Sequence, residues 1–130
     1  DLATLSQKPC MCGCIFPKLR EVHGRMTDIL TLADGQLIDG NGIGSLIKFL
    51  GQVAAFRIVQ DEPGKLRYEI VPGRKFHSEC VAVLMNYIQQ QFGYKLSAEV
   101  RLVDELLPDA GGKRHTVVSR VQAPYGFAEE

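Results

Sequence analysis

The clearest candidate for chemistry in this sequence is Lys113, in the run Leu-Pro-Asp-Ala-Gly-Gly-Lys-Arg at residues 107–114. The Gly-Gly pair before it predicts a mobile loop that carries one cation on a long stem. Such a cation can stabilise negative charge that develops on phosphoryl oxygens. Because no Gly-x-x-x-x-Gly-Lys-[Ser/Thr] element follows a strand, we expect most of a nucleotide pocket to lie elsewhere. The alternative reading is an ordinary solvated loop lysine.

A second candidate is the thiol cluster Cys10-Met-Cys12-Gly-Cys14. Three thiolates could contribute to a zinc site, although the usual structural knuckle is C-x-x-C and a closed site needs a fourth ligand. His23, or a side chain from outside this chain, could supply that ligand. Cys80 is more simply a core residue. We therefore assign no metal ligand and keep zinc binding as an alternative.

The elements that would position these residues begin with a short hairpin over residues 27–38, around an Asp-Gly turn at 34–35. Asn41 is expected to cap a helix that runs to about Leu50 and ends at Gly51, since apolar residues recur there at helical spacing. A more extended hairpin is predicted from the alternating runs 55–60 and 66–71, which are joined by a Pro-Gly turn.

A second helix is expected to start at Ser78 and stop at Gly93, with a stripe formed by Cys80, Leu84, Ile88 and Phe92. Alternation around residues 99–102 predicts a strand that ends before the Lys113 loop, and residues 116–121 predict a last short strand. The predicted fold class is α+β, a small mixed sheet with a β-hairpin and two covering helices.

Length and charge restrict the possible functions. The 130 residues suffice for one domain with its own core. Fifteen basic and fifteen acidic residues balance, so attraction to nucleic acid or to an anionic membrane is not expected. The longest apolar run falls far short of the ~20 residues of a spanning helix. The few cysteines fit a reducing compartment, and we expect a cytoplasmic location.

Four motifs in a fixed order give the chain a resemblance to the C-terminal lobe of the adenylate-forming enzymes, the acyl-CoA ligase superfamily. Within it, the chain is similar to the phenylacetate-CoA ligase and capsule-biosynthesis branch. The motifs are Asp1-Leu-Ala, like the end of Thr-Gly-Asp-Leu; Cys12-Gly with Phe16-Pro17; Gly24-Arg25-x-x-Asp28 followed by Asp34-Gly35; and Val103-Asp-Glu-Leu leading to Lys113 and Val117.

The resemblance implies a division into two parts. Residues 1–23 show no sustained period and would be an irregular lead-in from a missing N-terminal domain, while 24–130 would be a mobile C-terminal α+β domain. Because the chain opens on Asp1 rather than on methionine, we expect a piece of a longer polypeptide.

The resemblance also implies roles for particular residues. Lys113 would be the catalytic lysine that bridges a carboxylate and the α-phosphate of ATP. Asp1 would accept hydrogen bonds from the ribose hydroxyls, and Arg25 would lie near the ribose and phosphates, with Gly35 also in the cofactor-binding set. For Arg25 an ion pair with Glu21 or Asp28 is the competing interpretation.

Thr27 and Asp28 match the hinge on which the family's lobe swivels. Family members usually have Asp or Lys where this chain has Thr27, so the energetics of the swing would differ. Gly111 replaces the more usual Ser or Thr before Gly-Lys, and Pro108 falls one place later than in the family pattern. Neither departure removes the charge of Lys113.

The resemblance implies an ATP-dependent acyl-activating enzyme that adenylates a carboxylic acid and transfers the acyl group to a thiol, with Mg²⁺ and coenzyme A as further cofactors. Its partners would be the missing N-terminal adenylation domain and the acid substrate, and the isolated lobe would be inactive. Two alternatives stay open: a non-catalytic metal-binding or protein-interaction module, and transfer to an amine or sugar acceptor in capsule-type biosynthesis.

Overall fold

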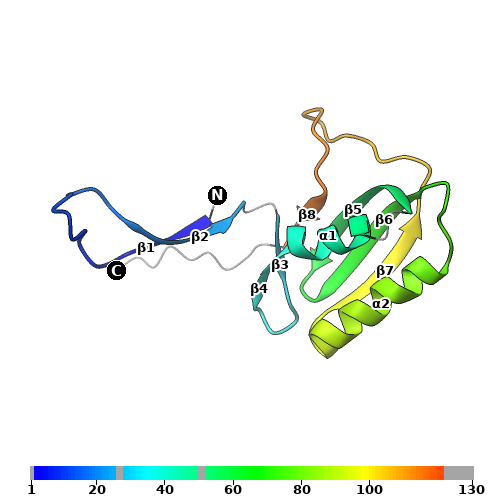
Figure 1. Ribbon diagram of the computed structural model, residues 1–130, viewed down its shortest axis with the longest axis horizontal. Helices are drawn as coiled ribbons and strands as arrows, with labels where there is room; N and C mark the ends of the chain where they lie inside the picture. The colour runs from blue at the N-terminus through cyan, green and yellow to red at the C-terminus, as the bar shows by residue number, and fades with distance from the viewer. Residues whose placement is uncertain (1, 26–27, 50–51, 122–130) are drawn as a thin grey trace.

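The computed structural model describes residues 2–25, 28–49 and 52–121. Along the chain it forms β1 (Leu2–Leu5), β2 (Leu19–Gly24), β3 (Ile29–Thr31), β4 (Leu37–Asp39), α1 (Gly40–Phe49), β5 (Val53–Glu62), β6 (Lys65–Pro72), α2 (Glu79–Phe92), the 3₁₀ turn η2 (Gly93–Lys95), β7 (Ser97–Leu102) and β8 (Val117–Ser119). Figure 1 shows these elements as a compact lobe with the β1–β2 ribbon projecting from it.

The lobe is built on a four-stranded sheet in the order β7-β6-β5-β8. Its centre is the antiparallel β5–β6 hairpin, with Ile58 opposite Tyr68, and β7 and β8 add to its two sides in parallel. A parallel neighbour needs a crossover connection, and α2 provides it between β6 and β7. The expected small mixed sheet with a β-hairpin is therefore confirmed.

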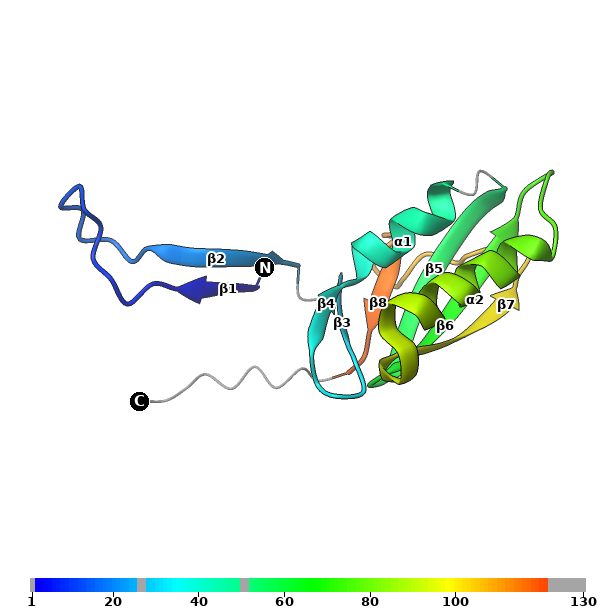
Figure 2. The same ribbon diagram turned by 60° about the horizontal axis from the view of Figure 1, so that its bottom comes forward.

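Both helices cover the same face of this sheet (Figure 2). Strand alternation turns Leu66, Tyr68 and Ile70 of β6 toward the helices, where all three are buried. They join one apolar cluster with residues of α1 and α2, among them Ile47 and Leu84. The opposite face carries charged side chains, because the alternate positions of the same strands point there. The two covering helices, and the α+β class, are as predicted.

Helix α2 buries the expected stripe, since Cys80, Leu84 and Ile88 are buried and Phe92 packs against the core. Gly93 ends the helix with a positive φ of 55°, which favours glycine. Ser78 occupies the residue before the helix, as expected, but its side chain makes no capping hydrogen bond. The predicted Ser78 cap is therefore wrong in its chemistry, although right in its position.

Helix α1 begins at Gly40, one residue before the predicted cap residue Asn41. The side chain of Asp39 accepts a hydrogen bond from the Asn41 backbone N–H at 3.0 Å, so Asp39 takes the capping role that we expected of Asn41. The Asn41 amide instead donates to the Asp28 carboxylate at 3.0 Å. The predicted end of this helix, Leu50 and Gly51, lies outside the described residues.

The β3–β4 hairpin is joined to the main sheet by the buried side chain of Gln60 on β5. Gln60 accepts from the Thr31 N–H and donates to the Thr31 carbonyl, each at 2.8 Å. The Gly64 N–H, in the turn between β5 and β6, donates to the same carbonyl at 2.8 Å. Since β3 begins directly after Asp28, these bonds connect the predicted hinge segment to the centre of the sheet.

The first residues are more regular than the sequence suggests. β1 and β2 pair antiparallel, with register irregularities, around a long connecting loop that holds the thiol cluster. Of the expected irregular lead-in of residues 1–23, residues 2–5 and 19–23 form strands instead, because cross-strand pairing can form without a long alternating pattern. The division into two domains stays a prediction. In the part of the chain that the structure describes, no helix has the length and apolar character needed to cross a membrane.

Candidate active-site loop

Lys113 lies in the long connection between β7 and β8, residues 103–116. Figure 1 shows this connection leaving the end of β7 and passing over the lobe before it reaches β8. The Gly-Gly pair lies in a turn closed by hydrogen bonds, and the expected mobility of this loop stays a prediction. Gly112 has a positive φ of 73°, while the adjacent Gly111 does not, so only Gly112 adopts a backbone conformation that favours glycine.

The carboxylate of Asp109 lies at the centre of this turn. One of its oxygens, Oδ1, accepts from the backbone N–H groups of Gly111 at 3.0 Å and of Lys113 at 2.9 Å. The Asp109 N–H donates to the Lys113 carbonyl at 3.0 Å, and the Gly112 N–H donates to the Asp109 carbonyl at 2.9 Å. The other carboxylate oxygen lies 3.0 Å from His115 Nε2. The turn is therefore closed by side-chain and backbone hydrogen bonds together.

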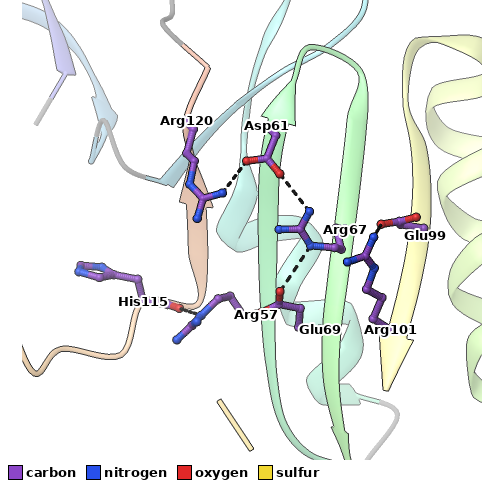
Figure 3. Close-up of polar contacts among 8 residues, drawn as sticks. All are labelled: Arg57, Asp61, Arg67, Glu69, Glu99, Arg101, His115 and Arg120. Atoms are coloured by element: carbon purple, nitrogen blue, oxygen red, sulfur yellow. Dashed lines mark hydrogen bonds and ion pairs between the residues drawn. The ribbon is translucent and has the colours of Figure 1, made fainter. Parts of the chain in front are cut away.

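Arg57 on β5 forms hydrogen bonds to the same connection on both sides of the turn. Its Nη2 donates to the Leu107 carbonyl on the arm before the turn. Its Nε donates to the His115 carbonyl on the arm after the turn, at 3.4 Å, and Figure 3 shows the two groups facing each other. The rigid fork of a guanidinium can reach two acceptors at once.

The side chain of Lys113 itself is left available. The residue is exposed, and none of the ion pairs formed by the described residues includes it. Asp109, the acid nearest in sequence, uses its two oxygens on the turn and on His115. The turn thus presents an uncompensated cation to solvent, which is the property that binding to a phosphate requires.

A hollow of about 270 Å³ lies beside the base of this connection. Apolar side chains of α1, β5 and the connection line it, together with cationic groups; these include Ile47, Phe56, Leu106, Arg57 and Arg114. Arg57 already donates to two carbonyls, so Arg114, which is exposed, is the cation more free to meet an anionic group there.

The open face of the sheet holds a chain of ion pairs (Figure 3). Asp61 on β5 lies 2.7 Å from Arg120, just after β8, and 3.0 Å from Arg67 on β6. Arg67 also lies 3.4 Å from Glu69. The hydrogen bond from Arg120, with a second from Arg67, holds the pKa of Asp61 below its ordinary value. Because these charges compensate one another, the face offers no strong net attraction for one sign of ligand.

The other predicted site residues are not gathered around Lys113. Gly35 lies in the β3–β4 turn with a positive φ of 86°. That turn lies against η2, since the Ala33 N–H donates to the Lys95 carbonyl at 2.9 Å, and against the β5–β6 turn, where Gly64 lies close to Ala33. Figure 1 shows this turn and the connection of residues 103–116 on opposite sides of the lobe.

The residues around the predicted hinge lie together, before β3. The Asp28 N–H donates to the Arg25 carbonyl at 3.0 Å, and the Arg25 side chain is exposed. Asp1 and Thr27 lie outside the described residues. Arg25 and Asp28 therefore share one segment, which is separate along the chain from the connection that carries Lys113, and none of their predicted roles is tested by this arrangement alone.

The thiol cluster forms a close pair rather than a complete cage. Cys10 Sγ and Cys12 Sγ lie 2.9 Å apart, and Cys12 and Cys14 are exposed. The hydrogen bond from Cys10 and a backbone N–H bond from Cys14 lower the pKa of the Cys12 thiol. Within the described residues, no group of three Cys, His, Asp or Glu side chains is placed to hold a metal ion.

Sequence reasoning missed Asp109 and Arg57 as supports of the Lys113 loop. The signal for Asp109 was present, because an Asp two residues before a Gly-Gly pair is typical of a turn in which the carboxylate accepts backbone N–H groups. No comparable signal marked Arg57, since its two partners are carbonyl groups far along the chain.

Comparison with known proteins gives a family but no closely related curated protein. The chain matches the model of the CapK C-terminal domain over residues 30–120, which is more than half of its length and includes Lys113. No curated protein matches it. A crystal structure of 2-hydroxyisobutyryl-CoA ligase, in the postadenylation state in complex with R3-HIB-AMP, is similar with a TM-score of 0.48 and 19% identity. The alignment covers 90% of this chain and 27% of the ligase chain.

The family match confirms the resemblance to the capsule-biosynthesis branch of the adenylate-forming enzymes. It rests on the segment that contains the four-stranded sheet, both helices and the Lys113 loop. The chain belongs to the CapK C-terminal domain family.

Proposed function

We propose that this chain is the C-terminal lobe of an ATP-dependent enzyme that activates a carboxylic acid as an acyl-adenylate. In this proposal the lobe brings Lys113 to the α-phosphate of ATP, while an N-terminal domain of the same polypeptide holds the nucleotide and the acid. The proposal is carried by the family match over residues 30–120. That segment includes Lys113, which is exposed on a turn closed by hydrogen bonds.

The chemistry of adenylation agrees with such a residue. When a carboxylate attacks the α-phosphate and pyrophosphate leaves, negative charge is concentrated on phosphoryl oxygens. A positioned ammonium lowers the energy of that arrangement more than the energy of the separated reactants. Lys113 has no competing ion pair among the described residues, so no internal partner has to be displaced before the ammonium meets the phosphate.

The remaining predicted residues have subordinate roles in the proposal. Asp1 would bind the ribose hydroxyls of ATP, Arg25 the ribose and phosphates, and Gly35 would be part of the cofactor-binding surface. Thr27 and Asp28 would form the hinge. The described residues contain no cluster that could hold a metal ion, so Mg²⁺ would be bound through the phosphates of ATP and the other domain, where it neutralises phosphate charge.

The proposal is tested in the full-length parent protein with Lys113→Ala. Pyrophosphate release from ATP is measured with a panel of carboxylic acids, first to find a substrate and then to compare variants. We expect kcat for release to fall about 100-fold to 1,000-fold, as for the loss of one transition-state donor. Lys75→Ala is the matched control, because Lys75 is an exposed lysine on the loop before α2. Unchanged release in Lys113→Ala would remove the catalytic role.

The acceptor of the acyl group is tested separately. We propose transfer to a thiol, that of coenzyme A, because the resemblance includes the acyl-CoA ligases. Preformed acyl-adenylate is offered coenzyme A, then an amine and an amino sugar, and the rate of AMP release is compared. Preference for the amine or the sugar would replace the thiol by the capsule-type acceptor and leave the adenylation step intact.

A further inference from the structure

We propose that Asp109 is a positioning residue for Lys113, with Arg57 as the second anchor of the same turn. This inference rests on the proposed function, because it assigns the turn a purpose in delivering the ammonium. It differs from that function in naming the groups that set where the ammonium can go. The resemblance marks Lys113 and the glycine before it, whereas the contacts of the structure mark the Asp109 carboxylate and the Arg57 guanidinium.

The first support is the number of bonds that meet at Asp109. Its side chain accepts hydrogen bonds from the N–H groups of Gly111 and Lys113. Its backbone N–H donates to the Lys113 carbonyl, and its backbone carbonyl accepts from the Gly112 N–H. Lys113 is therefore held by Asp109 at both its N–H and its carbonyl. Two bonds to the backbone of one residue restrict the direction in which its side chain leaves the turn.

The second support is that the Asp109 carboxylate does not neutralise the Lys113 ammonium. A carboxylate close to a lysine would ordinarily form an ion pair with it and neutralise it. Here the Asp109 carboxylate faces two backbone N–H groups and His115 Nε2, and no described ion pair joins it to the Lys113 ammonium. The acid is thus satisfied by the turn, and the cation stays free for a phosphate.

The third support is the attachment of the turn to the sheet. Arg57 donates to the carbonyls of Leu107 and His115, which lie on the two sides of the turn. It extends from β5, the same strand whose Gln60 holds the β3–β4 hairpin. A swing of the lobe about a hinge before β3 would therefore carry the turn with the sheet as one body.

The first experiment measures the turn itself in this chain and needs no activity. Amide hydrogen exchange at Gly111 and Lys113 is compared for the wild type, Asp109→Ala and Asp109→Asn. Loss of the acceptor in Asp109→Ala should accelerate exchange about tenfold at both amides, whereas Asn keeps a side-chain oxygen and should accelerate it less. Asp104→Ala, an exposed acid earlier in the same connection, is the matched control and should change neither amide. Unaltered exchange in Asp109→Ala would overturn the proposal.

The second experiment separates positioning from general support of the fold. In the full-length parent, pyrophosphate release is measured for Lys113→Ala, Asp109→Ala and the double variant. If Asp109 acts through Lys113, Asp109→Ala should lower kcat about tenfold alone and should lower it no further when Lys113 is already absent. If Asp109→Ala lowers kcat by the same factor with and without Lys113, its role is merely structural and the inference is overturned.

The failure of the positioning role can be told apart from the failure of the proposed function. If Lys113→Ala releases pyrophosphate at the wild-type rate, the proposed function fails, and the positioning of a catalytic lysine fails with it. If Lys113→Ala is impaired but Asp109→Ala and Arg57→Lys are not, the proposed function stands and the positioning role is overturned. Arg57→Lys is informative because a lysine keeps the charge but lacks the fork that reaches two carbonyls.

Discussion

Replacement of Gln60 by leucine tests how firmly the hinge-proximal hairpin is attached to the main sheet. Gln60 is fully buried, and its amide group forms two hydrogen bonds of 2.8 Å with the backbone of Thr31. Leucine has a similar size but forms neither bond. The Thr31 carbonyl would keep the Gly64 N–H as a donor, whereas the Thr31 N–H would lose the acceptor that Gln60 provides.

The magnitude follows from these two unequal losses. An N–H left buried without a partner costs about 1–3 kcal/mol, and the second bond contributes about 1 kcal/mol. Leucine recovers part of this by burying more apolar surface. The two losses sum to about 2–4 kcal/mol before this recovery, so we expect Gln60→Leu to lower the free energy of unfolding by about 1–3 kcal/mol.

The assay is urea unfolding of this chain, followed by circular dichroism. The dependence of the unfolding free energy on urea concentration is compared between variants, because an unchanged slope means that only the stability has changed. Ser119→Ala is the matched control, since Ser119 Oγ donates to the same Gln60 oxygen over a longer distance of 3.4 Å. It should cost well under about 1 kcal/mol. A loss below about 1 kcal/mol in Gln60→Leu would show that the bonds to Thr31 do not hold the hairpin.

Two further predictions concern a glycine and an ion pair. Gly64→Ala should lower the free energy of unfolding by about 2–5 kcal/mol in the same assay, because Gly64 has a φ of 72° and a new Cβ would lie 2.7 Å from the Cβ of Ala33. The control is Gly35→Ala, whose new Cβ would meet nothing within 4 Å and which should cost less. Equal costs for the two variants would contradict the close approach of Gly64 to Ala33. Arg120→Ala should raise the pKa of Asp61, measured by carbon-detected NMR titration, because its hydrogen bond is the largest cause of the lowered value. Since a lowered folded pKa stabilises the protein above the unfolded value of about 4, the stability gap between wild type and this variant should shrink as the pH falls below 4, and a constant gap would contradict it.

Much of the lobe is predictable because its patterns are local. The alternation of residues 55–60 and 66–71 predicts β5 and β6, and the stripe from Cys80 to Phe92 predicts α2. Errors occur where two neighbours could perform one task. Asp39 and Asn41 are both good capping residues, and only the start of α1 decides between them.

The parts that escape prediction depend on contacts between distant segments. Gln60 falls on the core-facing side of β5, where its polarity has no explanation until Thr31 lies against it. Arg57 likewise gains its role only when the connection of residues 103–116 returns to β5. The pairing of β1 with β2 spans a long loop and leaves no periodic signal in either strand.

The sequence marks Lys113 as a cation beside glycines, but it does not predict the turn in which Lys113 lies. The Gly-Gly pair predicts a loop, but it does not predict that the Asp109 carboxylate closes a turn around it. Of the two glycines, only Gly112 has the positive φ that favours glycine, so the backbone at Gly111 does not require one. A loop can thus have a glycine-rich composition and still hold its lysine in place.

The contact between Lys113 and the α-phosphate can be observed in a structure of the full-length enzyme with a non-reactive acyl-adenylate analogue. We expect Lys113 Nζ to lie within about 3 Å of an α-phosphate or acyl oxygen, the range of a charge-assisted hydrogen bond. A complex in which the adenylate is fully enclosed while Lys113 remains in solvent, far from both oxygens, would contradict it.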